Sequence, residues 1–377
     1  MVTILPDYIM SNANKDALDL ANKLHGRDIS VPPYNATSYY DDVTRHPYFD
    51  ALIVLRHYIK VASDAYWGQV VGAKNVDLFM MTPSVSSPMG PGSDSEAIAI
   101  KFGALDTYLV DSSQFGFEPL LFQNLDKVYC YLPSMRGEDP DNRHLNQFFH
   151  CEAEIVGALE DLKPLIEGYI KALAEISIAL LPLVRLLSKD PRKTEQALRD
   201  VLQASSFNRA SFEDAWSSLQ NTEQTKVYTK STPYGRGIDS GGEQHIALKN
   251  SSTIPMWIYG FDRDTVAFYQ KPDPANRDKT INADLIFPPL VPGGFGGEVV
   301  GSGQRQDDPK EMEESLARQG ISAEAYEWYV DLRKSPHYRT TSGFGLGIER
   351  FIAWMLGYES IRDVILYPRL KNVHTLP

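Results

Sequence analysis

Three observations predict a mixed α+β fold for this chain. Alternate glycines mark residues 343–347, a pattern typical of a strand whose backbone lies against a flat ligand, because no Cβ holds the ligand away. Two stretches rich in β-branched and aromatic residues flank a charged turn near residues 136–146, which indicates a β-hairpin. Apolar residues recur at helical spacing before and after that hairpin. We therefore expect strands and helices in separate blocks.

Residues 1–45 predict an N-terminal extension rather than a β-barrel. Asn12 to Leu24 are expected to form one helix, and Pro32-Pro33 starts an extended segment. No series of alternating strands occurs in this stretch, so an OB-fold is not expected here.

A long amphipathic helix is expected next, followed by a strand over Val76 to Met81 and by Pro83. Its apolar positions recur with the period of a helix. They are Phe49, Leu52, Ile53, Ile59, Ala62 and Tyr66.

The hairpin joins strands at Val128 to Leu132 and Gln147 to Ile155, with turn chemistry at residues 139–142. Arg136 and Glu138 are two apart on one strand and so face the same side. Arg136 can hold a phosphate while Glu138 accepts hydrogen bonds from an exocyclic amine. Phe148 on the returning strand offers a flat face to a purine or a guanidinium. The alternative is a salt-bridged surface hairpin without a ligand.

A helical block is expected at about residues 158–220. Its apolar stripe consists of Leu162, Leu165, Ile166, Tyr169, Ile170 and Leu173, continued by Leu180, Leu181, Val184 and Leu187. The charged segment Ser188 to Lys193 is expected to link two helices. We interpret this block as core packing, and a surface for an acceptor molecule is the alternative.

The chain ends in a strand, a turn and a helix. Ile348, Phe351, Ile352 and Met355 share one helical face, and Arg350 lies at the helix start, where an anion is favoured. A tight turn without ligand is the alternative.

Composition is typical of a cytoplasmic enzyme. The chain has 377 residues, is 43% hydrophobic and contains only two cysteines, Cys130 and Cys151, which favours a reducing compartment. The N-terminus lacks the features of a signal peptide, and the apolar run Ile176 to Val184 is too short to cross a bilayer. The net charge is −12, and no Lys/Arg cluster stands out for a polyanion.

The hairpin and the glycine-rich segment resemble motifs 2 and 3 of the class II aminoacyl-tRNA synthetases, in the asparaginyl/aspartyl branch and closest to its asparaginyl member. The long amphipathic helix and the strand after it resemble motif 1. Further matching blocks are residues 113–118, Pro255 to Tyr269, residues 297–305 and residues 326–333. The resemblance covers roughly residues 46–160 and 240–370.

This resemblance implies an antiparallel sheet of six or seven strands flanked by helices, with the helical block as an insertion in a catalytic domain over residues 46–377. It also implies a homodimer through the motif 1 helix and strand. The family's N-terminal anticodon-binding barrel has no counterpart in residues 1–45, which makes tRNA an unlikely partner in this interpretation.

The implied activity is that of an ATP-dependent, AMP-forming ligase. A carboxylate attacks the α-phosphorus of ATP, and the site must offset the repulsion between two anions. By resemblance the catalytic residues are Arg136, Arg350 and Glu298. The ATP-binding set is Arg136, Glu138, Arg143, His144, Phe148, Glu298, Gly345, Gly347 and Arg350.

Asp284 and Glu298 match the family's two acidic positions for Mg²⁺, whose preferred ligands are hard carboxylate oxygens. The alternative is a pair of ordinary strand-end acids. Residues 287–297 are longer and richer in Pro and Gly than the family's counterpart, which leaves the register of Asp284 open.

Side-chain selectivity is implied by Phe117, which stands where the aspartyl enzymes have a Lys, and by Glu118, which matches the asparaginyl enzymes. Glu118 would accept from a substrate carboxamide, and Arg305 would donate to its oxygen. A salt bridge between these two side chains in an empty pocket is the alternative. Candidates for the substrate α-ammonium are Gln114, Asp239 and Glu243.

Three functions remain open at this point. The first is a free-standing ligase that activates an asparagine- or aspartate-like amino acid and passes it to a small acceptor such as ammonia or an amine. Activation of a carboxamide followed by loss of AMP, which gives a nitrile, is a variant of it. The second is tRNA charging by an asparaginyl-tRNA synthetase-like enzyme. The third is a catalytically silent paralog that binds nucleotide.

Overall fold

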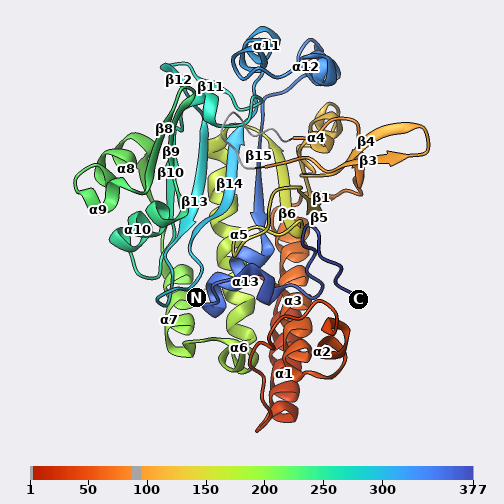
Figure 1. Cartoon of the computed structure of the whole chain (residues 1–377), viewed down its shortest axis with the longest axis vertical. Coiled ribbons are helices and arrows are strands. Elements are labelled where there is room, and N and C mark those ends of the chain that lie inside the picture. Colours follow the sequence, from red (N-terminus) through yellow and green to blue (C-terminus); the bar gives the residue numbers. More distant parts are fainter. Residues whose placement is uncertain (1–2, 87–94, 377) are drawn as a thin grey trace.

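The computed structural model describes residues 3–86 and 95–376 and has a large twisted sheet at its centre (Figure 1). Eight strands lie in the order β1-β5-β6-β15-β14-β13-β10-β7. Their bounds are β1 Lys74–Asn75, β5 Lys127–Met135, β6 Gln147–Val156, β7 Asn208–Ser211, β10 Met256–Tyr259, β13 Asn282–Phe287, β14 Gly297–Gln304 and β15 Thr341–Gly347. The six central strands pair antiparallel, whereas β1 and β7 pair parallel at the two edges. The α+β expectation is confirmed, with parallel edge strands added to the antiparallel sheet.

The expected strand over Val76 to Met81 is wrong as a single element. Lys74 and Asn75 form β1 beside β5, and the chain then leaves the main sheet. Met81–Thr82 form β2 in a second sheet, of order β2-β4-β3, with β3 at Ala99–Phe102 and β4 at Leu105–Leu109. One apolar stretch is therefore divided between two sheets, a partition that depends on partners distant in the sequence.

Helices cover one face of the main sheet. α3 (Pro47–Ala65) is the expected long helix, and its first turn starts at a proline whose missing N–H costs nothing there. It packs against α5 (Leu159–Ala179), and α13 (Ile348–Leu356) follows β15 directly. Behind the sheet, Trp67, Tyr169 and Phe344 form a buried aromatic cluster with ring centroids 5.1–6.2 Å apart. This core holds β15 from behind, so its other face is free to form a floor.

The N-terminal extension packs onto the same core. α1 (Asp7–Leu24) begins earlier than expected, directly after Pro6, and contacts α3, α5 and α6 (Leu181–Leu187). α2 (Tyr39–Arg45) precedes α3. Between residues 3 and 45 the structure has these two helices and no strand, so this stretch forms no barrel.

The helical block contains α5, α6 and α7 (Pro191–Gln203). Residues 188–190 link the last two, which is shorter than the expected linker Ser188 to Lys193 because Pro191 already begins α7. Its apolar stripe is mostly buried in the main core, which agrees with a packing role. The expectation of helix up to residue 220 is wrong in one part, because β7 interrupts it to pair with β10 before α8 (Phe212–Leu219).

The opposite face of the sheet is bordered by shorter elements (Figure 1). A hairpin of β8 (Thr229–Thr232) and β9 (Gly235–Ile238) precedes α10 (Ser240–Asn250). The remaining elements are α4 Gln114–Phe117, α9 Glu223–Lys226, β11 Pro272–Asp273, β12 Asn276–Thr280, α11 Pro309–Arg318 and α12 Glu327–Leu332. None of the described helices combines the length and the apolar character that a membrane span requires.

Candidate active site

Two cavities, of about 600 and 250 Å³, lie over the central strands. We call them the large lobe and the small lobe. Both are lined by Arg136, Arg143, His144, His150, Glu298, Gly345 and Arg350. The predicted meeting of Arg136 and Arg350 is therefore present, although the two arginines are far apart in the chain.

The pairing of β15 with β6 produces this meeting. Gly343, Gly345 and Gly347 lie opposite Glu154, Glu152 and His150 in the antiparallel register. A Cβ at position 343 would clash with the carboxylate of Glu154 and the guanidinium of Arg305, whereas a Cβ at position 345 would make only ordinary contact with Glu152, at 3.6 Å. The glycine strand thus leaves room for buried side chains at one end and for a ligand further along.

The small lobe has the character of a purine site. Phe148 lines it, and the guanidinium carbon of Arg136 lies 5.3 Å from the centroid of that ring. Glu138 is buried and its Oε2 accepts from the backbone N–H of Glu96 at 3.1 Å. Asn146 donates to the carbonyl oxygens of Arg136 and Glu138 at 2.8 and 2.7 Å, which fixes this backbone as an edge for an exocyclic amine.

The positive charge of Arg136 is not neutralised by an acidic side chain of the described residues. Its Nε is buried and has no hydrogen-bond partner, and among the described residues it forms no ion pair. Leaving a buried donor of a charged group unpaired is costly, and an anion in the cavity would remove that cost.

Arg350 and Arg143 occupy the junction of the two lobes. Arg350 Nη1 donates to the Glu298 backbone oxygen at 3.2 Å and to its carboxylate at 3.1 Å. Arg143 donates to the Gly296 carbonyl and lies 4.6 Å from the ring centroid of Phe295. Burial and the charge of Arg350 lower the pKa of Arg143. Two guanidinium groups that line the same cavities favour the binding of a multiply charged anion between them.

His144 is held on the same loop by Asp141, whose Oδ1 lies 2.9 Å from the ring Nδ1. Burial and the neighbouring Arg350 lower the pKa of His144. It lines both lobes, on the side of the junction where Arg143 lies.

Asp284 and Glu298 converge over Gly301 on adjacent strands. A Cβ added at this glycine would lie 3.3 Å from Glu298 Oε1 and 3.7 Å from Asp284 Oδ1. Burial and the charges of Glu298 and Glu243 raise the pKa of Asp284 well above its ordinary value. Burial would also raise the pKa of Glu298, but Arg350 and Arg143 outweigh it and lower that pKa.

The two carboxylates are hard oxygen donors of the kind that would hold a Mg²⁺ ion. Two hard carboxylates suit an ion that keeps water or phosphate oxygens in its remaining positions. Within residues 3–86 and 95–376, no three His, Cys, Asp or Glu side chains gather into a closed metal cage.

Glu243, a candidate for the substrate α-ammonium, lines the large lobe next to Glu298. Its Oε2 accepts from the backbone N–H of Glu298 at 2.9 Å and lies 3.9 Å from Arg143. Burial, partly offset by Arg143, raises the pKa of Glu243 to about 7. Asp239 lies beyond it on the cavity wall, where its carboxylate caps α10 by accepting from the Gly242 N–H at 2.9 Å.

The large lobe contains Arg305 and Gln114, but not Glu118. Arg305 donates from Nε and Nη2 to the buried Glu154, at 3.0 and 2.8 Å, and also to the side-chain oxygen of Gln114. Its guanidinium carbon lies 5.6 Å from the ring centroid of Tyr269. Arg305 therefore has a fixed orientation.

The structure does not form the expected pair of Glu118 and Arg305. Glu118 is 1% exposed, lines neither lobe and accepts from Arg333 Nη2 at 2.6 Å and from the Tyr329 hydroxyl. The reason is local geometry, because Glu118 directly follows the single turn of α4 and its side chain meets α12 in a separate core cluster around Phe115.

The sequence interpretation missed a row of cavity residues on β6. Side chains of a strand alternate between faces, so Phe148 predicts that His150, Glu152 and Glu154 share its face. His150 Nδ1 lies 3.0 Å from Ser134 Oγ, and Glu152 accepts from the Ser113 backbone N–H at 2.8 Å. Phe148, His150 and Glu152 form the floor from the small lobe into the large one. Glu154 lines neither lobe and is buried against Arg305.

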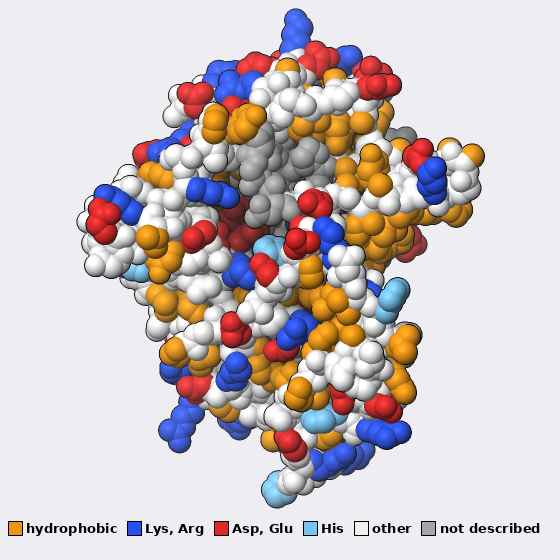
Figure 2. Space-filling model, viewed as in Figure 1, with side chains coloured by type: hydrophobic (Ala, Val, Ile, Leu, Met, Phe, Trp, Pro, Cys, Tyr) orange, Lys and Arg blue, Asp and Glu red, His pale blue; other side chains and the backbone are white. Residues whose placement is uncertain are grey.

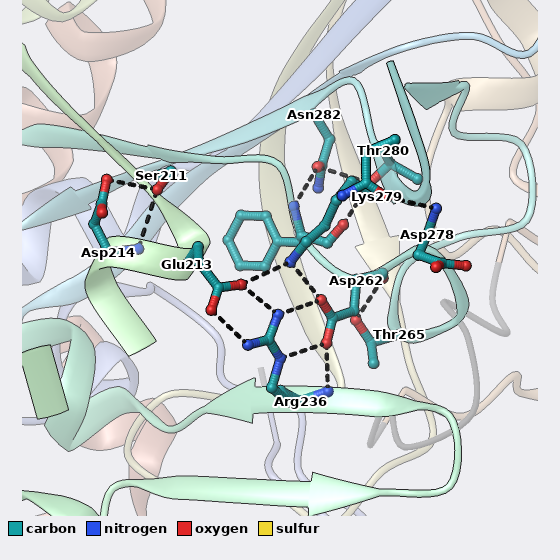
Figure 3. Close-up of polar contacts among 12 residues, drawn as sticks. Ser211, Glu213, Asp214, Arg236, Asp262, Thr265, Asp278, Lys279, Thr280 and Asn282 are labelled. Carbon is teal, nitrogen blue, oxygen red and sulfur yellow. Dashed lines mark hydrogen bonds and ion pairs between the residues drawn. The ribbon is translucent and has the colours of Figure 1, made fainter. Parts of the chain in front are cut away.

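The outer wall of the large lobe is the β8–β9 hairpin, anchored by the charge network of Figure 3. Arg236 binds the carboxylates of Asp262 and Glu213, and Lys279 donates to Asp262 at 2.6 Å. Burial would raise the pKa of Asp262, but hydrogen bonds from Arg236 and Lys279 outweigh it and lower that pKa to about 2.

Comparison with known proteins gives a consistent result. The family described as tRNA synthetases class II (D, K and N) matches residues 80–371. An asparagine–tRNA ligase of Thermococcus kodakarensis is 34% identical over 271 residues, which are 70% of this chain and 58% of that protein. A second, from Pelotomaculum thermopropionicum, is 32% identical over 302 residues, 78% of this chain and 64% of that protein. The chain thus spans about three fifths of the length of these curated relatives.

Solved structures agree in fold. The asparaginyl-tRNA synthetase from Pyrococcus horikoshii complexed with asparaginyl-adenylate has a TM-score of 0.77 at 25% identity, over 89% of this chain and 71% of that one. The Entamoeba histolytica asparaginyl-tRNA synthetase, also with asparaginyl-adenylate, has a TM-score of 0.72 at 23% identity, over 94% of this chain and 74% of that one.

Proposed function

The chain belongs to the class II tRNA synthetases of the D, K and N group, and on that premise we propose that it activates an asparagine-like amino acid with ATP. The products of this step are an aminoacyl-adenylate and pyrophosphate. The observation that carries the proposal is the placement of Arg136 and Arg350 in the walls of both lobes.

The arginine side chains around the two lobes would reduce the repulsion between the two anions that react in adenylation. The attacking carboxylate and the α-phosphate are both anions, and charge builds on the phosphoryl oxygens during in-line displacement. Arg136, with its unpaired Nε, would stabilise that charge, while Arg350 and Arg143 would bind the phosphates that leave. A Mg²⁺ ion held by Asp284 and Glu298 would add positive charge on the same phosphates. Phe148 and the backbone beside Glu138 would hold the adenine.

The large lobe supports a carboxamide side chain. Arg305 is already matched by the carboxylate of Glu154, so an uncharged amide adds no unpaired charge to a buried site, whereas an aspartate side chain would add one. Gln114 and Glu152 would bind the α-ammonium. Relatives solved with asparaginyl-adenylate are consistent with this substrate class.

For the second step we propose transfer to a small amine or to ammonia. Lys and Arg alternate with Asp and Glu over the described part of the face in Figure 2, without one basic patch, and the net charge is −12. Both features disfavour a polyanionic acceptor. Transfer to tRNA is the second candidate, because the curated relatives are named asparagine–tRNA ligases.

We also propose a homodimer. A small sheet of β2, β3 and β4 extends from the body as an arm (Figure 1) and exposes Phe79, Met81, Phe102 and Leu105, which are 37–65% exposed. Hydrophobic side chains gather around the base of this arm (Figure 2). A second copy would bury the same apolar patch from both sides.

The test uses exchange of labelled pyrophosphate into ATP with Asn, Asp, Gln and Glu in turn. Exchange that depends on Asn is expected, and its absence with all four amino acids would leave a nucleotide-binding protein without ligase activity. Mass spectrometry of products made with ammonium chloride, and in parallel with total tRNA, then identifies the acceptor. Charging of tRNA at ordinary synthetase rates with no amide product would establish the second candidate.

A further inference from the structure

His150 occupies the one position on the β6 floor that belongs to both lobes. Of the four side chains in that row, Phe148 lines the small lobe, Glu152 the large lobe, and His150 both. Alternate residues on a strand lie about 6.6 to 6.8 Å apart. With adenine on Phe148 and an α-ammonium at Glu152, His150 lies beside the bond that joins the carboxyl carbon to the phosphate.

The contacts of the ring leave one nitrogen for a ligand. Nδ1 lies 3.0 Å from Ser134 Oγ and 3.7 Å from Glu152 Oε1. Nε2 has no hydrogen-bond partner among the described residues, and the ring packs edge-on against Phe148 with centroids 4.7 Å apart. The side chain is 13% exposed, so the ring is held in place and mostly screened from bulk water.

We propose that His150 is the general base of the second step, in which an amine or ammonia attacks the aminoacyl-adenylate. The assignment rests on the proposed function and adds the proton path of its transfer step. The acceptor nitrogen forms a bond to the carbonyl carbon, and Nε2 takes the proton that this nitrogen loses. The bond from the carbonyl carbon to the phosphate oxygen breaks, and its electron pair leaves with AMP. The imidazolium then returns its proton to water.

The electrostatics suit such a base. Burial, Arg136 and Arg350 lower the pKa of His150, so the ring is neutral and can accept a proton before reaction. The charged groups that line the same junction are Glu152 on β6, Arg136 at the end of β5, Arg350 on α13, Arg143 on the hairpin loop and Glu298 on β14. A bound acyl phosphate adds negative charge beside the arginines, and the nearby Glu152 stabilises the imidazolium as it forms.

The experiment separates the two half-reactions. Pyrophosphate exchange measures adenylation. Transfer is measured in a single turnover, with the adenylate preformed, pyrophosphate removed by pyrophosphatase, and ammonium chloride or hydroxylamine added. His150→Gln and His150→Ala are compared with wild type and with His57→Gln, an exposed control on α3.

We expect exchange in His150→Gln to stay within about threefold of wild type while transfer falls by about 10²- to 10⁴-fold. When the rate is divided by the concentration of unprotonated amine at each pH, wild-type transfer should still rise with pH along one titration, and that rise should be absent in the variant. Added imidazole should restore transfer in His150→Ala, where the missing side chain leaves space.

Several outcomes would overturn the assignment. Equal loss in both half-reactions would make His150 a phosphate contact, and unchanged transfer would exclude it as the base. Failure of imidazole rescue together with an unchanged pH profile would leave only a structural role. If the wild-type protein catalyses exchange but transfers to neither amine, ammonia and small amines are excluded as acceptors, and the role of His150 in that transfer is excluded too. If the wild-type protein catalyses no exchange, the proposed function itself is refuted.

Discussion

Arg136 is the residue on which the proposed adenylation most directly depends, because its buried Nε has no hydrogen-bond partner in the described structure. We predict that Arg136→Gln lowers the rate of pyrophosphate exchange by about 10²- to 10³-fold, the usual effect of removing one donor to a developing oxyanion. Arg136→Lys should recover little, because an ammonium cannot reproduce the planar fork.

The control for this prediction is Arg192→Gln, which changes an exposed arginine on α7. Neither variant should melt below the wild-type temperature, since Arg136 forms no ion pair with another described residue and its buried Nε is unpaired. Normal exchange in Arg136→Gln would show that the α-phosphate lies elsewhere.

Glu118 forms a buried ion pair with Arg333 rather than a substrate contact, and the consequence is a stability effect. Both side chains are 0–1% exposed. Glu118→Gln should reduce the free energy of unfolding by about 3 to 5 kcal/mol, because it leaves the guanidinium of Arg333 buried and unpaired. Urea unfolding measures this loss. A stable variant with an altered preference between Asn and Asp would instead place Glu118 in contact with the substrate.

At the scale of elements, the glycine strand supports a paired prediction. Gly343→Ala introduces a Cβ that collides with Glu154 and Arg305, so it should raise the KM for the amino acid at least about tenfold by moving the guanidinium. Gly345→Ala meets only Glu152 at 3.6 Å, and position 345 lines the small lobe as well as the large one, so it should raise the KM for ATP more than Gly343→Ala does. Steady-state exchange with each substrate varied measures both effects. Equal effects of the two substitutions on both KM values would contradict the assignment of the lobes.

The β8–β9 hairpin supports a pH prediction through Asp262. The folded pKa of Asp262 is lowered from 3.8 to about 2, so its stabilising contribution is present above pH 3.8 and is lost as pH falls toward 2. Because this carboxylate is only partly buried, solvent screening reduces the stabilisation that the lowered pKa implies to about 1 kcal/mol. Asp262→Asn should be less stable than wild type by about that amount at neutral pH. The gap should close only in the acid range just named, as urea unfolding at successive pH values would show. A gap that closes near pH 6 would point to a different group.

Elements with local signatures were predictable, and those made by distant pairing were not. Alternate glycines followed by a helical apolar stripe predicted β15 and α13, and turn residues between two β-rich runs predicted β5 and β6. β7 and the division of residues 74–82 between two sheets depend on partners far away in the chain. The same distinction applies to the candidate site residues. Arg136 and Arg350 could be proposed from the sequence because each lies within a local motif. Arg305 pairs with Glu154 rather than with Glu118. In the sequence, the only sign of this pair is that Glu154 lies on the same face of β6 as Phe148.

At the scale of the whole molecule, the two lobes lie at different positions along strand β6, because Phe148 lines the small lobe and Glu152 the large one. Strands β6, β15 and β14 lie side by side, so the floor of the cavity is a continuous backbone surface whose side chains alternate between the aromatic core and the ligand. Helix α5 packs against the back of this floor, while the β8–β9 hairpin and the loop between β5 and β6 line its walls.

The exposed arm formed by β2, β3 and β4 predicts where two copies of the chain contact each other. Phe102 and Leu105 are 61% and 65% exposed at the tip of the β3–β4 hairpin, and apolar groups this prominent are costly in water unless a partner covers them. We expect the wild-type protein to sediment as a dimer at micromolar concentration and the double variant Phe102→Asp, Leu105→Asp to sediment as a monomer, because two charges would have to be buried in the interface. Val227→Asp, at a residue 71% exposed after α9 on another part of the surface, is the matched control and should remain dimeric. A monomeric wild type, or a double variant that still dimerises, would show that the arm is not the contact between copies.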